Sequence, residues 1–110
     1  MKQVVINLQD YRTPGSRLFT GRDRGIEVRK KSKINEIEKS AAHIRLLIPE
    51  DIGSVNPSFL EGFLLDVVIK LGADRFMEKF EVVNTGHYQV KEDLEEAVDR
   101  ILCADLKNIY

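Results

Sequence analysis

Apolar residues recur along this chain at spacings that predict helices alternating with short strands. The clearest pattern is an i, i+1, i+4, i+5 stripe over residues 57–71, which is typical of a helix with one buried face. Asn56 suits the N-cap of this helix, Pro57 its first position and Gly72 a left-handed C-cap. A second stripe predicts a helix over residues 90–106, with acidic residues crowding its first turns as the helix dipole favours.

Shorter apolar runs predict the strands. The run over residues 43–48, ended by Pro49, predicts a strand covered on both faces, and residues 80–84 predict a further strand. Residues 4–8 predict an opening strand. Pro14-Gly15 then predicts a type II turn that returns the chain to Leu18 and Phe19. We therefore expect an opening hairpin over about residues 3–20.

Charged residues dominate the remaining helical segments. Residues 21–32 predict a charged helix that breaks near Ser32, and residues 34–39 predict a separate turn of helix. Asp74 is a candidate cap for a short helix before the strand at residues 80–84. The order β-β-α-β-α-(α)-β-α indicates an α/β fold with parallel strand pairs and right-handed crossovers. At 110 residues, we expect one domain spanning residues 1–110.

Composition narrows the class of protein further. Hydrophobic residues make up 43% and charged residues 32%, which is typical of a globular chain and not of a disordered one. The single cysteine, Cys103, excludes an internal disulfide, and its place in an apolar stripe predicts a small buried hydrophobe. Neither a signal peptide nor a membrane-spanning run is evident, so we expect a soluble protein of the cytoplasm, without a membrane partner.

Charge is distributed unevenly along the chain. The net charge is −1, yet residues 1–33 hold nine Lys and Arg against three Asp and Glu, and residues 34–110 hold eight against fifteen. Such a polarised surface could attract an acidic partner, or its opposite halves could meet in a homodimer, although a solvated helix face is the favoured interpretation. An alternative function is nucleic-acid or anion binding through the basic amino-terminal third: Arg22, Arg24, Arg29, Lys30, Lys31 and Lys33. A pI of about 6.1 and the absence of Trp argue against nucleic acid.

A search for catalytic chemistry gives little. The two histidines lack ligand spacing, and no nucleophile elbow or P-loop is present. Arg22 and Arg24 stand at a glycine-punctuated helix start that could bind an anion. Glu50-Asp51 ends the strand at 43–48 and could bind Mg²⁺ in a small enzyme, although a solvated loop is the favoured interpretation. We therefore expect no enzyme activity, no metal and no cofactor.

The junction before the helix at residues 57–71 offers a different chemistry. With Asn56 as the cap, Ser58 lies in the first helical turn, at the positive end of the dipole. A phosphate on Ser58 would be favoured there and would add about −1.5 to −2 charge at one point. Ser54, four residues earlier, is the second candidate for phosphorylation.

Three short stretches give the chain a resemblance to a known family. They are Thr20-Gly21-Arg22-Asp23-Arg24-Gly25, Ile48-Pro49-Glu50-Asp51-Ile52, and Ser58-Phe59 leading into Gly62-Phe63. From Phe19 to about Leu102 the chain resembles the STAS domain of anti-sigma-factor antagonists, and more closely the STAS-like family of small uncharacterised prokaryotic proteins. The resemblance implies a mixed sheet of about four or five strands flanked by helices.

The same resemblance implies a role in partner switching. STAS proteins of this type dock on a serine kinase with a GHKL-type ATP fold and lose this partner when phosphorylated. Their Asp-Ser-Ser-Gly motif falls on Asn56-Pro57-Ser58-Phe59, where only the second serine, Ser58, is retained. The sequence therefore predicts a regulatory module that binds a kinase-like protein and is switched at Ser58. Its expected contact residues are Gly53, Ser54, Asn56, Pro57 and Ser58.

Overall fold

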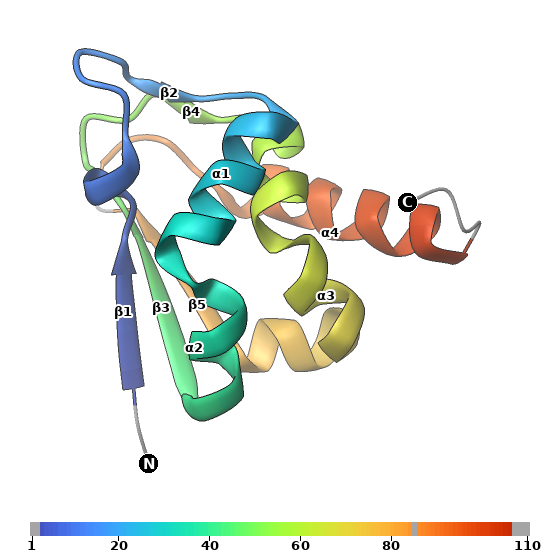
Figure 1. Cartoon of the computed structure of the whole chain (residues 1–110). Coiled ribbons are helices and arrows are strands. Elements are labelled where there is room, and N and C mark those ends of the chain that lie inside the picture. The colour runs from blue at the N-terminus through green and yellow to red at the C-terminus, as the bar shows by residue number, and fades with distance from the viewer. Residues whose placement is uncertain (1–2, 85, 107–110) are drawn as a thin grey trace.

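A computed structural model of the chain describes residues 3–84 and 86–106 (Figure 1). Within these residues it contains four α-helices, one 3₁₀ helix (η1) and five strands that form two parallel sheets. In chain order the elements are β1 (Gln3–Asn7), η1 (Leu8–Tyr11), β2 (Leu18–Phe19), α1 (Arg22–Ser32), α2 (Ile34–Ser40), β3 (His43–Ile48), β4 (Ser54–Val55), α3 (Pro57–Lys79), β5 (Phe80–Asn84) and α4 (Lys91–Leu106). The α/β class predicted from the sequence is confirmed.

The larger sheet has the order β1-β3-β5, and both of its strand pairs are parallel. The helices lie on one side of it (Figure 1). The prediction that residues 43–48 are covered on both faces is wrong, because Ile44, Leu46 and Ile48 are buried while His43 and Arg45 are exposed. On the open face Arg45 donates a 2.8 Å hydrogen bond to Glu81 of β5, so polar side chains keep this face in water.

The expected opening hairpin is wrong, and so is the mixed sheet of four or five strands. β1 pairs with β3, and β2 pairs in parallel with β4 as a separate two-stranded sheet. The predicted turn does form, with Gly15 at a φ of 81° and a hydrogen bond from the Ser16 N–H to the Thr13 carbonyl. However, Asn7 caps η1 at the end of β1, which turns the chain away before a hairpin partner can align.

The helix breaks fall where the sequence predicts them. Lys33 adopts a left-handed φ of 58° between α1 and α2, next to the buried Ser32. Gly72 leaves helical geometry at φ 78°, which ends the first and longer part of α3. The chain resumes as a short helix after Gly72 and reaches Lys79 before β5 begins. The short helix predicted around Asp74 is therefore confirmed as the second part of α3.

Helices α1 and α3 cross at unusually close range because each presents a glycine. A Cβ atom built on Gly25 would lie 2.1 Å from the carbonyl oxygen of Phe59, and one on Gly62 would lie 2.2 Å from that of Arg22. Only glycine permits such an approach of two backbones. The motif residues Gly25 and Gly62 thus have a packing role, and the contact fixes where the amino end of α3 lies relative to α1.

The hydrophobic core lies between the sheet and the helices. Its largest fully buried side chains include Phe19, Phe59, Phe63 and Phe76, and the ring centroids of Phe19 and Phe59 are 5.0 Å apart. Cys103 does not belong to this core, contrary to the prediction, because it is exposed on α4. Two positions beyond the buried Ile101, a helical residue points about 200° away from the apolar stripe.

One carboxylate is buried beside this core. Glu38 of α2 is 3% exposed and accepts hydrogen bonds from Lys70 at 2.6 Å and Lys79 at 2.7 Å, both on α3. Burial raises the pKa of Glu38, but the hydrogen bonds and charges of the two lysines together outweigh it and leave this pKa below its usual value. The ionised carboxylate therefore fastens α2 to the far half of α3.

None of the helices within residues 3–84 and 86–106 combines the length and the apolar character needed to cross a membrane.

Candidate functional site

The amino end of α3 begins with a side-chain cap of two bonds. The backbone N–H and the hydroxyl of Ser58 both donate to Oδ1 of Asn56, at 2.9 and 2.7 Å. Pro57 occupies the first helical position, where its missing N–H leaves no bond unmade. The cap predicted from the sequence is confirmed, and Ser58 lies in the first turn as expected, although it is half-buried.

The loop before this cap is held by the small β2·β4 sheet. Leu18 lies opposite Ser54 and Phe19 opposite Val55 in the parallel register. The Gly53 N–H donates to the Arg17 carbonyl at 2.8 Å, and the Asn56 N–H donates to the Phe19 carbonyl at the same distance. Backbone bonds on both flanks therefore fix residues 53–56 at a defined position.

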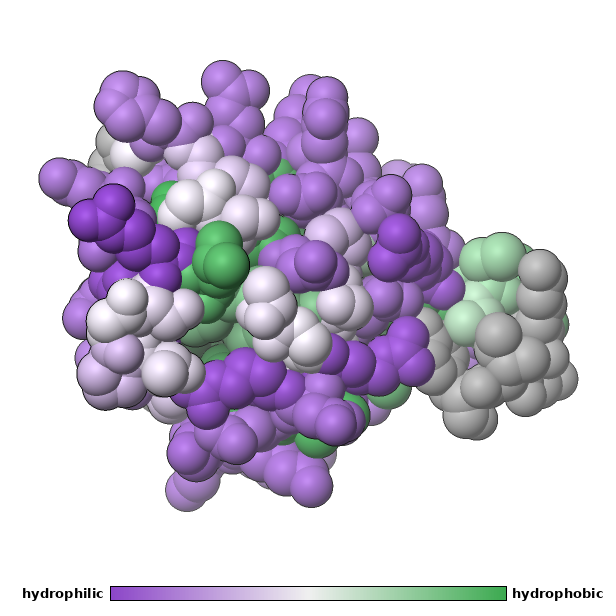
Figure 2. Space-filling view, turned by 90° about the horizontal axis from the view of Figure 1, so that it is seen from above, coloured by the Kyte–Doolittle hydropathy of each residue, from purple (hydrophilic) through white to green (hydrophobic). Residues whose placement is uncertain are grey.

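These bonds bring the five predicted contact residues together at one end of the molecule. Gly53 and Asn56 are exposed, and Ser54, Pro57 and Ser58 are half-buried. Figure 2 views the molecule from this end, the end of β2 and β4, and shows a small apolar patch within a largely hydrophilic surface.

Leu18 is a member of this surface that sequence reasoning missed. It is 53% exposed and lies directly opposite Ser54, one of the predicted contact residues. Its exposed side chain adds apolar area to the surface around residues 53–58. The apolar pair at residues 18–19 was the one sequence feature that pointed to Leu18, and it was interpreted as the returning strand of a hairpin.

Phe59, the residue after Ser58, does not contribute its side chain to this surface. Its side chain is fully buried and packs on Phe19 and Phe63. Phe59 therefore belongs to the core beneath the amino end of α3.

A tyrosine joins this junction to the amino end of α4. The hydroxyl of Tyr88 donates to Oδ2 of Asp93 at 2.5 Å and lies 3.0 Å from the carbonyl oxygen of Val55, so two acceptors share its single hydrogen. Burial and the adjacent carboxylate raise the pKa of Tyr88 far above its ordinary value, so the phenol stays protonated. The tie holds the end of β4 against α4, and no local pattern in the sequence indicated it.

The predicted anion-binding arginines both have partners in the folded chain. Arg22 forms an ion pair with Glu61 at 3.3 Å, and Arg100 of α4 approaches the same carboxylate at 3.5 Å. Arg24 pairs with Glu27 and donates to the Tyr11 carbonyl at 2.6 Å. The two side chains thus serve different parts of the structure and do not converge on one point through these contacts.

Other basic residues of the amino-terminal third also form ion pairs within the chain. Arg29 lies 3.5 Å from Asp66, and Lys31 lies 3.1 Å from Glu27. Basic residues in the last turn of α1 also complement the helix dipole. These contacts weaken the alternative of a nucleic-acid or anion-binding surface, since much of the positive charge has an internal partner.

Asp51 has a structural role, because its carboxylate forms a bidentate ion pair with an arginine. Arg12 donates to both of its carboxylate oxygens, at 2.8 and 3.1 Å. This hydrogen bonding lowers the pKa of Asp51 and raises the pKa of Arg12. Among the described residues no cluster of three or more His, Cys, Asp or Glu side chains is placed to hold a metal ion.

Comparison with known proteins finds no family model, no curated protein and no solved structure that matches this chain.

Proposed function

We propose that this chain is a non-catalytic regulatory module that binds another protein through residues 53–58 and Leu18. The observation on which this proposal rests is the half-buried Ser58 in the first turn of α3, whose hydroxyl donates to Asn56, together with the exposed Leu18 opposite Ser54. Together with the resemblance to STAS-like domains, it supports a STAS-like protein of the cytoplasm. Its partner would be a GHKL-type, ATP-binding, kinase-like protein.

Phosphorylation at Ser58 is the proposed switch. A phosphate there removes the hydroxyl hydrogen that Ser58 donates to Asn56, and losing such a bond costs about 0.5–1.5 kcal/mol. The positive end of the α3 dipole returns about 0.3–1 kcal/mol to a new negative charge. Because the two effects nearly cancel, phosphorylation changes the charge of the surface and leaves α3 folded.

The charges around Ser58 make the fold tolerant of this phosphate. Glu61, one helical turn further along the same face, is 6% exposed and paired with Arg22 and Arg100. Its negative charge is compensated, so it repels a phosphate on Ser58 only weakly. The phosphate dianion would instead weaken binding, because the groups of the partner that contact it would lose water without gaining a counter-charge.

A binding experiment with charge variants tests the proposal. The tagged full chain is used to recover partners from its native host, and mass spectrometry examines both the partners and the peptide containing Ser54 and Ser58. The purified partner is then titrated against Ser58→Asp and Ser58→Ala. Ser40→Asp is the matched control, because Ser40 is an exposed serine at the end of α2.

Recovery of an ATP-binding kinase-like protein supports the proposal if Ser58→Asp weakens binding at least about tenfold, about 1.4 kcal/mol, while Ser40→Asp does not. Leu18→Asp should weaken the same complex. Equal affinity of the Ser58 and Ser40 variants, with both serines 54 and 58 unmodified in the cell, would contradict it. All four variants should unfold within a few degrees of the parent chain, so that a loss of binding is not a loss of fold.

A further inference from the structure

β5 is an edge strand whose outer side has no strand partner among the described residues. It pairs with β3 alone, so every second backbone N–H and C=O of Phe80–Asn84 points away from the sheet. Proteins usually protect such an edge with a proline, a bulge, charged side chains or a covering segment. β5 contains no proline, and the one charge on it, Glu81, is already paired with Arg45.

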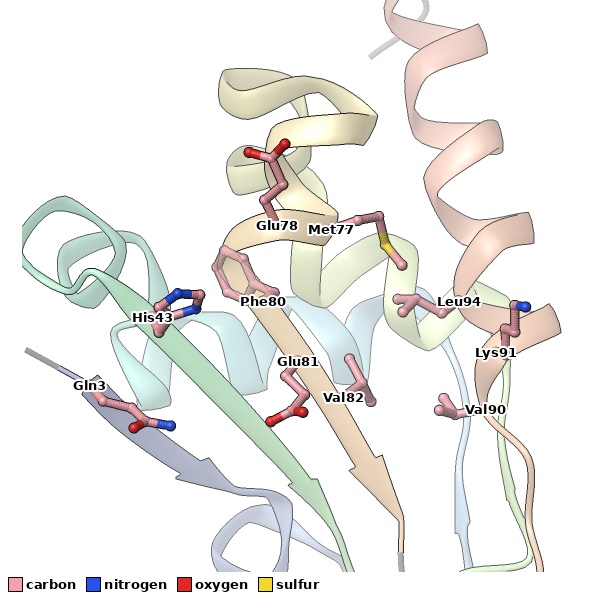
Figure 3. A pocket seen from close by; sticks show the side chains of 10 residues that line it. All are labelled: Gln3, His43, Met77, Glu78, Phe80, Glu81, Val82, Val90, Lys91 and Leu94. Carbon is pink, nitrogen blue, oxygen red and sulfur yellow. The ribbon is translucent and has the colours of Figure 1, made fainter.

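A groove of about 630 Å³ runs beside this edge. Its strand side is formed by Phe80, Glu81 and Val82, and α4 and the end of α3 supply the opposite wall. Figure 3 shows Met77, Val82, Val90 and Leu94 gathered on the helix side of β5, with Gln3, His43 and Glu81 on the other side.

The apolar side chains of this groove are incompletely covered. Met77 is 47% exposed, and Val82 and Val90 are half-buried, although both pack against the core. An extended segment next to β5 would cover them with side chains that alternate in direction, and would satisfy the outward backbone groups at the same time.

We propose that this groove binds an extended segment of a partner protein as a fourth strand of the sheet, next to β5. The segment has apolar side chains at alternate positions, because one face of the added strand meets Met77, Val82 and Val90. Backbone hydrogen bonds to the β5 edge provide affinity, and the apolar contacts provide specificity.

The charges at the rim define the occupant further. Lys91 and Glu78 line the groove, and neither has an ion-pair partner within residues 3–84 and 86–106. A segment with an acidic residue beside Lys91 and a basic residue beside Glu78 complements both.

The groove favours a segment of a different protein over a second copy of this chain. The outer edge of β5 is flanked by the first turn of α4, with Lys91 and Leu94 in the wall. Two copies joined edge to edge would bring two such walls, and two Lys91 side chains, into the space between their β5 strands. One extended segment needs only the width of the groove.

Selection from a random library of displayed ten-residue peptides, with the full-length protein as the target, tests this proposal. We expect the selected peptides to carry apolar residues at alternate positions, and to protect amides of β5 from hydrogen exchange. Methylating every second backbone nitrogen of such a peptide, in the register that faces β5, should weaken binding at least about tenfold, since those hydrogen bonds are lost.

Two matched surface variants locate the binding. Met77→Asp should weaken the peptide at least about tenfold, and Lys91→Glu should shift selection from acidic toward basic residues at one position. Leu18→Asp, also a change from an exposed apolar residue to aspartate but on the surface around Ser58, should leave affinity within about twofold. Because this groove does not include Ser58 or Leu18, failure here leaves the proposed function standing, and the reverse also holds.

Several outcomes would overturn the proposal. These are a selection that enriches no peptide, peptides that protect amides outside β5, and equal losses for Met77→Asp and Leu18→Asp. Sedimentation of the unliganded protein as a dimer that Met77→Asp converts to monomer would identify a second copy as the occupant and refute the partner-strand assignment.

Discussion

The close crossing of α1 and α3 predicts that Gly62→Ala is a destabilising substitution, although alanine favours helices more than glycine does. The added Cβ would lie 2.2 Å from the Arg22 carbonyl oxygen and 3.0 Å from the Ile26 nitrogen. Both obstacles are backbone atoms of α1, so no side chain can rotate away. The helices must separate by about 1 Å to restore van der Waals contact near 3.5 Å.

The magnitude follows from two opposed effects. Overpacking a well-packed site costs about 1–3 kcal/mol, and the upper end applies where two backbones must part. Alanine returns about 1 kcal/mol of helix propensity. We therefore expect a net loss of about 2 kcal/mol, which lowers the melting temperature of a domain of this size by about 9 °C. Gly25→Ala, placed 2.1 Å from the Phe59 carbonyl, should behave alike.

Urea unfolding followed by circular dichroism measures this loss. Gly53→Ala is the control, because its Cβ would lie 3.7 Å from the nearest atom, the Arg17 carbonyl oxygen, and it should stay within about 0.5 kcal/mol of the parent. The double variant Gly25→Ala/Gly62→Ala should cost less than the sum of the singles, since one separation of the helices relieves both clashes. A neutral or stabilising Gly62→Ala would refute the close crossing.

Three further substitutions test contacts that position the site. Glu38→Gln should lower the free energy of unfolding by about 1–3 kcal/mol, whereas Glu36→Gln, at an exposed position, should leave it nearly unchanged. Because the pKa of Glu38 is lowered, the stabilisation by this carboxylate should be present above about pH 4 and fade below it in acid unfolding. Asn56→Ala should cost about 1 kcal/mol through loss of the α3 cap, and an unchanged urea midpoint would contradict the cap. Tyr88→Phe should cost about 1–2 kcal/mol at neutral pH. Because the pKa of Tyr88 is raised, the parent should lose this advantage progressively above about pH 10, whereas an advantage that stays the same in alkali would argue against the tie.

Elements specified by neighbouring residues could be predicted from the sequence. The cap of α3 needs only Asn56, Pro57 and Ser58, and the bond from the Ser58 N–H to Asn56 spans two positions. The breaks at Lys33 and Gly72 likewise depend on the local chain. The exposed face of β3 could also have been predicted, because Arg45 interrupts the apolar run at an alternate position and its side chain lies on that face.

The rest of the site depends on residues that are distant in the sequence. β2 and β4 have two residues each, too few to show a period, so their pairing could not be read from either segment. A turn of the predicted type forms at Gly15, yet the turn alone does not decide which strand the chain joins next. Competition among strands for β3 as a partner is a property of the whole core, so a local hairpin signal was misleading.

The contacts that hold the proposed surface in place also join residues that are far apart in the sequence. Arg12 and Asp51 are 39 residues apart in sequence, and Tyr88 and Val55 are 33 apart. Each bond joins segments that only the folded arrangement of the sheet and its helices brings together. Local sequence thus determines that a serine begins α3, and long-range packing determines that Leu18 and residues 53–58 surround it. A mutation in the α1–α3 crossing should therefore disturb the surface around Ser58 without altering any residue on it.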